Sequence, residues 1–378
     1  MSFRVLLAGG GTGGHVIPAL AVAEQLRAED PEAELLFVGA HGGLEAKLVP
    51  PAGFELALLA VGKLKGSGFT ARLRTLVGLP PAVVRAIALA RRFDPDVVVG
   101  VGGYASGPLA LAARLLRRPL LLLEQNAIPG STNRALARLA QRVVTSFEGT
   151  PGFPPDKTIC LGNPLRARMV SALTSASAGP ARAAGAEERG GGARPARLFV
   201  FGGSQGARWL NESCVEALPQ VATRLPAGLE VVHQTGEADR ERVRAAYAEA
   251  GLAATVAAFF SDEMVEHYRW ADLALCRSGA TTIAELGVAG LPAFLVPYPY
   301  AANDHQAANA QQAVEAGGAL MRRQGDLDAG QLARTLTALL DDRARLAHMA
   351  GAMRSCGRPR AAAAVVALLR ELAISTRR

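Results

Sequence analysis

Residues 4–27 read RVLLAGGGTGGHVIPALAVAEQLR and decide the fold of the first half of the chain. A short apolar strand, residues 4–8, precedes a glycine-rich turn, and residues 16–27 follow with helical spacing. Residues 198–218, LFVFGGSQGARWLNESCVEAL, repeat this order with a strand over 198–201 and a helix over 207–218. Such a turn brings backbone N–H groups close to an anion, which the positive end of the helix also favours. The chain therefore has two candidate phosphate-binding turns, although tight strand–helix packing alone also explains either one.

Short apolar strands and amphipathic helices alternate after both turns. Further strands are expected at residues 35–38, 97–100, 120–124, 143–145, 230–234, 273–276 and 293–297. This alternation predicts an α/β protein of two doubly wound, Rossmann-like domains with parallel sheets. We expect the first domain at 1–166, a flexible insertion rich in Ala, Gly, Ser and Arg at 167–196, and the second domain at 197–355. The last segment, 356–378, contains a helix over 361–373 that is expected to pack on the first domain.

The composition indicates a folded chain with a sizeable core in each domain. Of the 378 residues, 50% are hydrophobic and 20% are charged, and this length suits two domains of roughly 100–200 residues. The cysteines form no C-x-x-C pair, which argues against a disulfide framework or zinc site and fits a reducing cytoplasm; they are Cys160, Cys214, Cys276 and Cys356. Glycines interrupt the N-terminal apolar run, and no run of about 18 apolar residues occurs, so we expect neither a signal peptide nor a spanning helix.

The net charge of +8 is unevenly distributed along the chain. Between Glu55 and Glu124, ten basic residues accompany only two acidic ones, Asp94 and Asp96, and such clustering points to a polyanionic partner. Residues 63–93 also mix these basic residues with apolar ones, and Pro80-Pro81 is expected to split them into two short segments.

An anionic bilayer suits this basic, apolar stretch, because each Lys or Arg near such a surface contributes about 1 kcal/mol. Nucleic acid is the competing polyanion, and we predict no nucleic-acid partner because Phe69 and Phe93 are the only aromatic residues available for stacking. A core helix with a solvated basic face is the remaining alternative.

Two glycine-rich turns at the carboxyl ends of two sheets would face each other across a cleft, where open α/β sheets bind ligands. The first turn also matches the dinucleotide fingerprint through Gly9, Gly11 and Gly14. The strand at 35–38, however, ends in Gly39-Ala40 instead of the acidic residue that a dinucleotide-binding dehydrogenase needs for the ribose. Asp94-Pro95-Asp96 resembles a D-x-D metal clamp but precedes a strand, so it indicates a turn at the wrong end of the sheet. No metal site is predicted.

A third candidate site reads CRSGATTIAE at residues 276–285. Ser278 or Gly279 is expected to begin a helix, along which Glu285 would accept two ribose hydroxyls; the alternative is an N-capped helix with a solvent-facing glutamate. After the next strand, polar residues are expected to line the same crevice: Asp304, His305, Gln306 and Asn309.

His15 lies in the first turn of the first predicted helix. It is a candidate general base, because the positive helix end favours the neutral imidazole that a base requires. The alternatives are a positioning residue or a helix-end histidine that only forms local hydrogen bonds.

Seven segments in order along the chain resemble the MurG family, the bacterial peptidoglycan N-acetylglucosaminyltransferases. They are GGGTGGHVIP (9–18), GVGGYASGP (100–108), EQNAIPG (124–130), GNPLR (162–166), GGSQGA (202–207), ADLALCRSGATTIAE (271–285) and GLPAFLVP (290–297). Any one segment is weak evidence, whereas the ordered set is specific and covers nearly the whole chain outside residues 171–195.

The resemblance implies a GT-B fold of two facing Rossmann-like domains with a cleft between them. It implies transfer of GlcNAc from UDP-GlcNAc to the 4-hydroxyl of MurNAc in undecaprenyl-diphospho-MurNAc-pentapeptide, which converts lipid I to lipid II in peptidoglycan synthesis. It also implies a peripheral enzyme at the cytoplasmic face of the inner membrane that needs no cofactor.

Roles for single residues follow from the same resemblance. The acceptor diphosphate would lie beside Thr12, Gly13 and Gly14, with Asn126 nearby, and the donor diphosphate would meet Arg166 and Ser204. Glu285 would hold the ribose and Gln306 would lie near the sugar. Further substrate contacts are implied for Tyr104, Gln205, Ser261, Met264, Ala280, Thr281, Thr282, Ile283 and Ala284. Ser261 stands where the family often has an isoleucine that touches the uracil, and the insertion is longer than the family leads us to expect.

We expect an inverting single displacement, in which the acceptor hydroxyl attacks the anomeric carbon as UDP leaves from the opposite face. Negative charge builds on the leaving diphosphate, so helix N-termini and Arg166 would stabilise it without a required metal. His15 would remove the hydroxyl proton, and His15 and Glu285 are the two residues assigned to catalysis. Three alternatives stay open: a sugar-nucleotide epimerase of the same architecture, an NAD dehydrogenase and a non-catalytic membrane scaffold.

Overall fold

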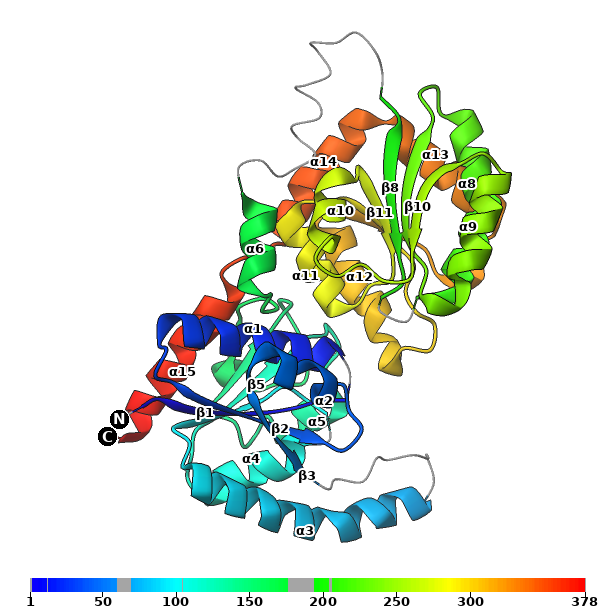
Figure 1. Ribbon diagram of the computed structural model, residues 1–378. Coiled ribbons are helices and arrows are strands. Elements are labelled where there is room, and N and C mark those ends of the chain that lie inside the picture. The colour runs from blue at the N-terminus through cyan, green and yellow to red at the C-terminus, as the bar shows by residue number, and fades with distance from the viewer. Residues whose placement is uncertain are drawn as a thin grey trace. The chain divides into compact units, whose positions relative to one another are not determined.

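The computed structural model describes residues 2–11, 13–59, 69–103, 105–175, 194–203 and 206–377. The chain divides into two compact units (Figure 1). The first unit comprises Met1–Ala167 together with Arg358–Arg378, and the second comprises Arg168–Gly357. Each unit contains a parallel sheet with its own core, which confirms the predicted α/β class.

The first unit is built on a seven-stranded parallel sheet in the order β3-β2-β1-β4-β5-β6-β7. Its strands are β1 (Arg4–Ala8), β2 (Glu34–Ala40), β3 (Glu55–Leu59), β4 (Val97–Gly100), β5 (Leu120–Glu124), β6 (Arg142–Thr145) and β7 (Thr158–Cys160). The central strands are buried on both faces, which is why they read as unbroken apolar runs. The two edge strands, β3 and β7, were not predicted.

Helices cover both faces of this sheet (Figure 1). The helices are α1 (Gly13–Glu29), α2 (Glu45–Leu48), α3 (Phe69–Phe93), α4 (Ser106–Leu115), α5 (Ser131–Leu136) and α15 (Ala361–Arg377), with short 3-10 turns η1 (Pro50–Ala52) and η2 (Pro155–Lys157). On one face, α15 places Val365, Val366 and Leu369 in a common core with α1. The opposite face packs α3 and α4 through small buried side chains such as Ala86 and Ala112.

Helix α3 corrects the expectation that Pro80 and Pro81 divide residues 63–93 into two short segments. The helix runs through both prolines. Each proline removes one backbone donor but fixes φ near the helical value. Beyond the prolines, Ala82, Ala86 and Ala90 are buried. Packing against the rest of the first unit therefore keeps the helix continuous where its sequence favours an interruption.

The second unit is built on a six-stranded parallel sheet in the order β10-β9-β8-β11-β12-β13. Its strands are β8 (Ala196–Phe201), β9 (Leu229–Gln234), β10 (Ala253–Ala257), β11 (Leu273–Cys276), β12 (Ala293–Leu295) and β13 (Ala319–Met321). The helices are α6 (Ala167–Thr174), α8 (Arg208–Arg224), α9 (Arg240–Glu249), α10 (Met264–Trp270), α11 (Ala280–Ala289), α12 (His305–Glu315), α13 (Ala329–Asp341) and α14 (Arg343–Ser355), with 3-10 turns η3 (Glu237–Asp239), η4 (Ala302–Asp304) and η5 (Gln324–Asp326).

An ion-pair cluster around the buried Asp272 fixes the start of β11. The Asp272 carboxylate accepts hydrogen bonds from Arg194 at 2.6 and 2.8 Å, from Arg343 at 2.8 Å and from the Arg197 backbone N–H at 2.9 Å. Burial acts to raise the pKa of Asp272, but the two guanidiniums outweigh it and hold the pKa below its usual range. The cluster ties the chain that enters β8 to the neighbouring strand.

The predicted flexible insertion at 167–196 needs correction at both of its ends. Helix α6 occupies Ala167–Thr174, where Leu173 is buried, and β8 already begins at Ala196. The remaining part, residues 176–193, lies outside the described residues.

In both sheets the order in which strands are added switches from one side to the other, and this reversal lies next to a glycine-rich turn. In the first unit the reversal lies between β1 and β4, and in the second between β8 and β11. Ligands of open α/β sheets bind at the carboxyl ends of strands beside such a reversal. The two predicted phosphate-binding turns, which follow β1 and β8, therefore lie at the expected position in each unit.

Candidate active site

The first glycine-rich turn packs directly against the loop that follows β4. A Cβ atom at Gly9 would lie 2.0 Å from Val101 Cγ2, and one at Gly103 would lie 2.4 Å from the carbonyl oxygen of Gly10. Any larger residue would push the two loops apart. Glycine is therefore required here so that both sides of the strand-order reversal form one surface.

His15 lies half-buried in the first turn of α1, as its position in the sequence predicts. A Cβ atom at Gly102 would lie 3.0 Å from His15 Nε2, so the imidazole rests against the loop after β4. Ser106 holds that loop by donating to the carbonyl oxygens of Ala8 at 2.9 Å and Gly102 at 2.8 Å. The ring is thus placed by both loops at the carboxyl ends of β1 and β4.

Glu45, the first residue of α2, is a site residue that the sequence did not reveal. Its fully buried carboxylate accepts the N–H of Gly11 at 2.9 Å and the N–H of Ala40 at 2.8 Å. A Cβ atom would collide with this carboxylate at three glycines: Gly10, Gly39 and Gly43. Glu45 therefore ties the glycine-rich turn to the end of β2.

This carboxylate also bears on the dehydrogenase alternative. An acidic group is present at the end of β2, but it comes from the following helix and its two oxygens are bonded to backbone amides. Because Glu45 is fully buried, it is not available to a ribose.

Asn126 lies in the loop after β5, which Glu124 shapes. The Glu124 side chain is 2% exposed and accepts the N–H groups of Asn126 and Gly130 and the amide of Asn133, each at 3.0 Å. A buried carboxylate with several donors fixes the loop in one conformation. Asn126 itself is half-buried in this loop.

Arg166 is ion-paired within the first unit. Its guanidinium donates to the carboxylate of Glu24 on α1, with Nε at 3.0 Å from Oε2. The side chain is about one-third exposed. The role implied for Arg166 at the donor diphosphate therefore requires that the guanidinium contact the ligand while Glu24 holds it, or that it leave Glu24.

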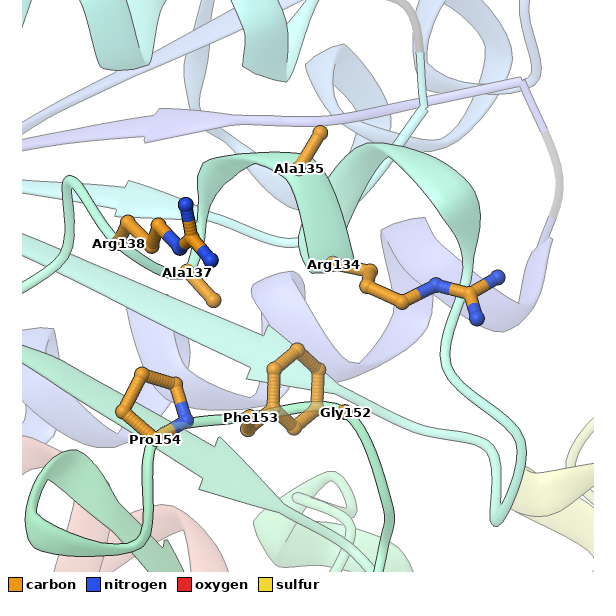
Figure 2. A pocket seen from close by; sticks show the side chains of 7 residues that line it. All are labelled: Arg134, Ala135, Ala137, Arg138, Gly152, Phe153 and Pro154. Carbon is orange, nitrogen blue, oxygen red and sulfur yellow. The ribbon is translucent and has the colours of Figure 1, made fainter.

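The first unit also contains a cavity of about 470 Å³ that holds none of the predicted site residues. Figure 2 shows Arg134 on α5 and Arg138 in the turn directly after it, with Phe153 and Pro154 on the facing loop. Both arginines are exposed, and within the described residues neither forms an ion pair. The cavity suits a small anionic group.

In the second unit, Gln234 holds the glycine-rich turn after β8. This buried side chain donates to the carbonyl oxygen of Gly203 at 3.0 Å and accepts the N–H of Phe260 at 2.8 Å. Gly206 has φ of +71°, and a Cβ atom there would lie 1.9 Å from the carbonyl oxygen of Thr235. The turn is therefore fitted to the loops after β9 and β10.

Glu285 lies in α11 and is bonded to Tyr268 of α10. The Tyr268 hydroxyl donates to Glu285 Oε2 at 2.7 Å. Burial raises the pKa of Glu285 to about 7, although the bond from Tyr268 acts to lower it. Glu285 is therefore a half-buried glutamate that is hydrogen-bonded within the unit.

The other residues of this run occupy the first turn of α11, which begins at Ala280 with Gly279 as its N-cap. Thr281, Thr282 and Ala284 are partly exposed, whereas the side chains of Ala280 and Ile283 are buried in the unit. Ala280 and Ile283 can therefore contact a ligand only through their backbone. Two further predicted substrate contacts lie before and in α10: Ser261, expected at the uracil, is exposed, and Met264 is half-buried at the start of the helix.

Gln306 joins the loops after β11 and β12. Its Oε1 accepts the N–H of Tyr298 at 2.9 Å and the N–H of Ser278 at 3.3 Å, and Ser278 Oγ donates to the carbonyl oxygen of Gln306 at 2.8 Å. Asn309 donates to the carbonyl oxygen of Ser278 at 3.2 Å. The structure thus brings Gln306 and Asn309 to the start of the segment that leads to Glu285.

Arg277 is a second residue with a role that sequence reasoning missed. It is 8% exposed and donates to the carbonyl oxygens of Val296 and Pro297 and to Gln324. Burial lowers the pKa of Arg277 to about 10. Its side chain fixes the loops after β11 and β12 relative to each other.

Four predicted residues, Thr12, Tyr104, Ser204 and Gln205, lie outside the described residues, as do residues 60–68 of the basic stretch and the side chains of 69–79. Asp96, which directly precedes β4, accepts the N–H of Arg4 at 2.9 Å and so links the start of β4 to β1. Within the described chain, no group of three His, Cys, Asp or Glu residues is arranged to hold a metal ion. None of the described helices is long and apolar enough to cross a membrane.

Comparison with known proteins identifies the family. Residues 5–145 match the glycosyltransferase family 28 N-terminal domain, and residues 197–365 match the glycosyltransferase family 28 C-terminal domain. The chain belongs to glycosyltransferase family 28. It is 48% identical over 379 residues to the UDP-N-acetylglucosamine–N-acetylmuramyl-(pentapeptide) pyrophosphoryl-undecaprenol N-acetylglucosamine transferase of Nitratidesulfovibrio vulgaris (strain DP4), covering 99% of each chain.

Solved structures agree with this family 28 assignment. The crystal structure of Acinetobacter baumannii MurG matches with a TM-score of 0.78 and 32% identity, over 98% of this chain and 99% of that one. The predicted resemblance to the MurG family and the GT-B fold are thereby confirmed. UDP-GlcNAc 2-epimerase from Neisseria meningitidis matches with a TM-score of 0.65 at 14% identity, over 98% of this chain and 100% of that one, and shares the fold alone.

Proposed function

We propose that this chain transfers GlcNAc from UDP-GlcNAc to the MurNAc 4-hydroxyl of lipid I and so forms lipid II. The observation that carries the proposal is the identity of 48%, end to end, with a relative named for this reaction. The site supports it, because both units place a glycine-rich turn at a strand-order reversal, where diphosphates bind.

The second unit supplies the donor subsite in this proposal. Glu285, with one oxygen bonded to Tyr268, accepts the ribose hydroxyls, and the turn after β8 receives the diphosphate at the N-terminal end of α8. Gln306 uses Oε1 for the loops, which leaves its amide N–H groups as donors toward the sugar.

The first unit supplies the acceptor subsite. Gly13 and Gly14 open α1 and offer backbone N–H groups to the acceptor diphosphate, with Asn126 nearby. His15 takes the proton of the 4-hydroxyl as that oxygen attacks the anomeric carbon, and the UDP oxygen leaves from the opposite face with the electron pair of the broken bond. Helix N-termini and Arg166 stabilise the charge that builds on UDP.

We also propose that the first unit associates with an anionic membrane surface. The basic residues between Glu55 and Glu124 and the arginine-lined cavity at Arg134 and Arg138 support this part of the proposal. Such an interaction would place the enzyme at the cytoplasmic face of the membrane that carries its lipid-linked acceptor. Cosedimentation with vesicles of anionic and of zwitterionic lipid tests this association, and equal binding to both would contradict it.

The test of the reaction is UDP release from UDP-GlcNAc, measured with and without a short-chain lipid-diphospho-MurNAc-peptide. Release only with the acceptor is the expected result, because transfer needs its hydroxyl. Turnover of the donor alone would favour the epimerase, and tight NAD binding would favour the dehydrogenase. Vesicle binding with an untouched donor would favour the non-catalytic scaffold.

A further inference from the structure

We propose that Tyr268 is a positioning residue for the donor: its hydroxyl holds one oxygen of Glu285 and so presents the other oxygen to the ribose. The inference rests on the proposed function, because it takes the nucleotide of the second unit to be a UDP-sugar. Tyr268 itself touches no substrate in this scheme, so its effect passes through Glu285 alone.

The Tyr268 side chain is held by close packing. Its side chain is 0% exposed. Its ring meets the rings of Phe199 and Phe201 edge to face, each with centroids 5.7 Å apart. Both phenylalanines belong to β8, the central strand that leads into the glycine-rich turn. The hydroxyl is therefore fixed relative to the sheet that carries the diphosphate-binding turn.

The hydrogen bond between Tyr268 and Glu285 leaves the second carboxylate oxygen available. The phenol has one proton to donate, and it donates it in a hydrogen bond to Glu285 Oε2 at 2.7 Å. A carboxylate has about four acceptor positions, so Oε1 keeps its capacity for two ribose hydroxyls. Without Tyr268, a glutamate side chain in the second turn of α11 could rotate about its terminal bonds, and ordering it would oppose binding.

The charge of Glu285 sets how strongly it accepts the ribose hydroxyls, because hydrogen bonds to an ionised carboxylate are stronger than those to a neutral acid. Burial raises its pKa to about 7, and the Tyr268 bond opposes this rise. Among the described residues, the thiol of Cys276 on β11 is a further titratable group that interacts with Glu285, and burial raises the pKa of that thiol. Two basic side chains belong to neighbouring helices. Arg354 of α14 lies at the C-terminal end of α11, and the His305 ring of α12 is hydrogen-bonded to the carbonyl oxygen of Ala302, in the loop before α12. Tyr268 is thus the neighbour that lowers the pKa of Glu285 against the effect of its burial.

The experiment replaces the hydroxyl in Tyr268→Phe and, as a matched control, in Tyr247→Phe. Tyr247 is 1% exposed in the same unit, and its hydroxyl lies 2.8 Å from His233 Nδ1 instead of a carboxylate. Both changes remove one buried phenolic oxygen and keep the ring. Circular dichroism and thermal unfolding of both variants establish that they are folded.

For Tyr268→Phe we expect the KM for UDP-GlcNAc to rise about tenfold to a hundredfold, the range for a lost bond to a charged group, with a smaller change in kcat. The acid limb of kcat/KM for the donor should move to higher pH, because the pKa of Glu285 rises further without its donor. Tyr247→Phe should keep the wild-type KM and acid limb. A Tyr268→Phe enzyme that matches Tyr247→Phe in both the KM for UDP-GlcNAc and the position of the acid limb would overturn the proposal.

Calorimetry with UDP and with 2′,3′-dideoxy-UDP adds a readout that a general structural role would not move. Tyr268→Phe should weaken the binding of UDP and leave the affinity for the dideoxy nucleotide unchanged. In a Glu285→Gln background, the same substitution should cause little further loss of UDP affinity. An equal loss for both nucleotides would overturn the proposal. If Tyr268→Phe does not fold, the pH dependence of nucleotide binding to the wild type is the test. We expect the affinity for UDP to fall on the acid side and the affinity for dideoxy-UDP to stay constant there. Equal acid-side behaviour of the two nucleotides would overturn the proposal. Failure of the proposed function would appear separately, as a wild type that neither binds UDP nor releases it from UDP-GlcNAc.

Discussion

Replacing Glu45 by glutamine tests how the first glycine-rich turn is held. The carboxylate accepts two backbone N–H groups, from Gly11 at 2.9 Å and from Ala40 at 2.8 Å. A carboxamide has one oxygen and one NH2 group, so in either orientation one of these N–H groups faces another donor. Loss of one buried, charge-assisted bond costs about 1.5–3 kcal/mol.

Hydrogen exchange measures this loss at the residues concerned. About 1.4 kcal/mol corresponds to a factor of ten in an equilibrium, so the amide of Gly11 or Ala40 should exchange about 10–100 times faster in Glu45→Gln. The turn it leaves unsecured should also bind the acceptor less well, and we expect the KM for the lipid-linked acceptor to rise more than the KM for UDP-GlcNAc.

Glu32→Gln is the matched control, because Glu32 is an exposed glutamate of the same unit. It should leave the exchange rates of residues 9–14 and 38–43 unchanged. If Glu45→Gln exchanges like Glu32→Gln over these residues, Glu45 does not hold the turn and the reasoning fails.

Three further predictions concern catalysis, stability and the second turn. His15→Ala should lower kcat by about 10²–10⁴ in steady-state assays if His15 is the base, and a near-normal rate would end that assignment. Asp272→Ala should destabilise the second unit by about 1.5–3 kcal/mol, because it removes the buried carboxylate to which two partly exposed guanidiniums and a backbone N–H donate. Urea unfolding followed by fluorescence tests this, since both tryptophans lie in that unit, and overlapping curves would contradict it. Because the folded pKa of Asp272 is lowered, this stabilisation is present above the ordinary value of 3.8 and is lost as pH falls through the folded pKa. Gly206→Ala should abolish tight UDP binding in a calorimetric titration, because its Cβ would lie 1.9 Å from Thr235 O; unchanged affinity would show that the turn adapts.

Central strands could be predicted from the sequence, whereas edge strands could not. Strands β4, β5 and β11 are buried along their whole length and read as plain apolar runs. Strands β3, β7 and β10 lie at sheet edges and are largely half-buried or exposed, so their sequences lack that signal. Helix α3 was misjudged for a different reason, because burial of its later alanines outweighs the local preference of two prolines.

The site followed the same division between local and long-range information. His15 and Glu285 could be found because each belongs to a short motif on one strand and its helix. Glu45 and Tyr268 act from a different element, 34 residues from Gly11 and 17 residues from Glu285, and no local motif marks either contact. A signal for Glu45 was present in Gly10, Gly39 and Gly43, all of which leave room for its carboxylate.

The composition of the first unit has a consequence for folding during synthesis. Helix α15 supplies Val365, Val366 and Leu369 to the core beneath α1, although the whole second unit is translated between the two helices. At about 5–20 residues per second, Arg168–Gly357 takes roughly 10–40 s to emerge. For that time the nascent first unit shows an uncovered apolar face, on which a chaperone could act, while the second unit already has every strand it needs.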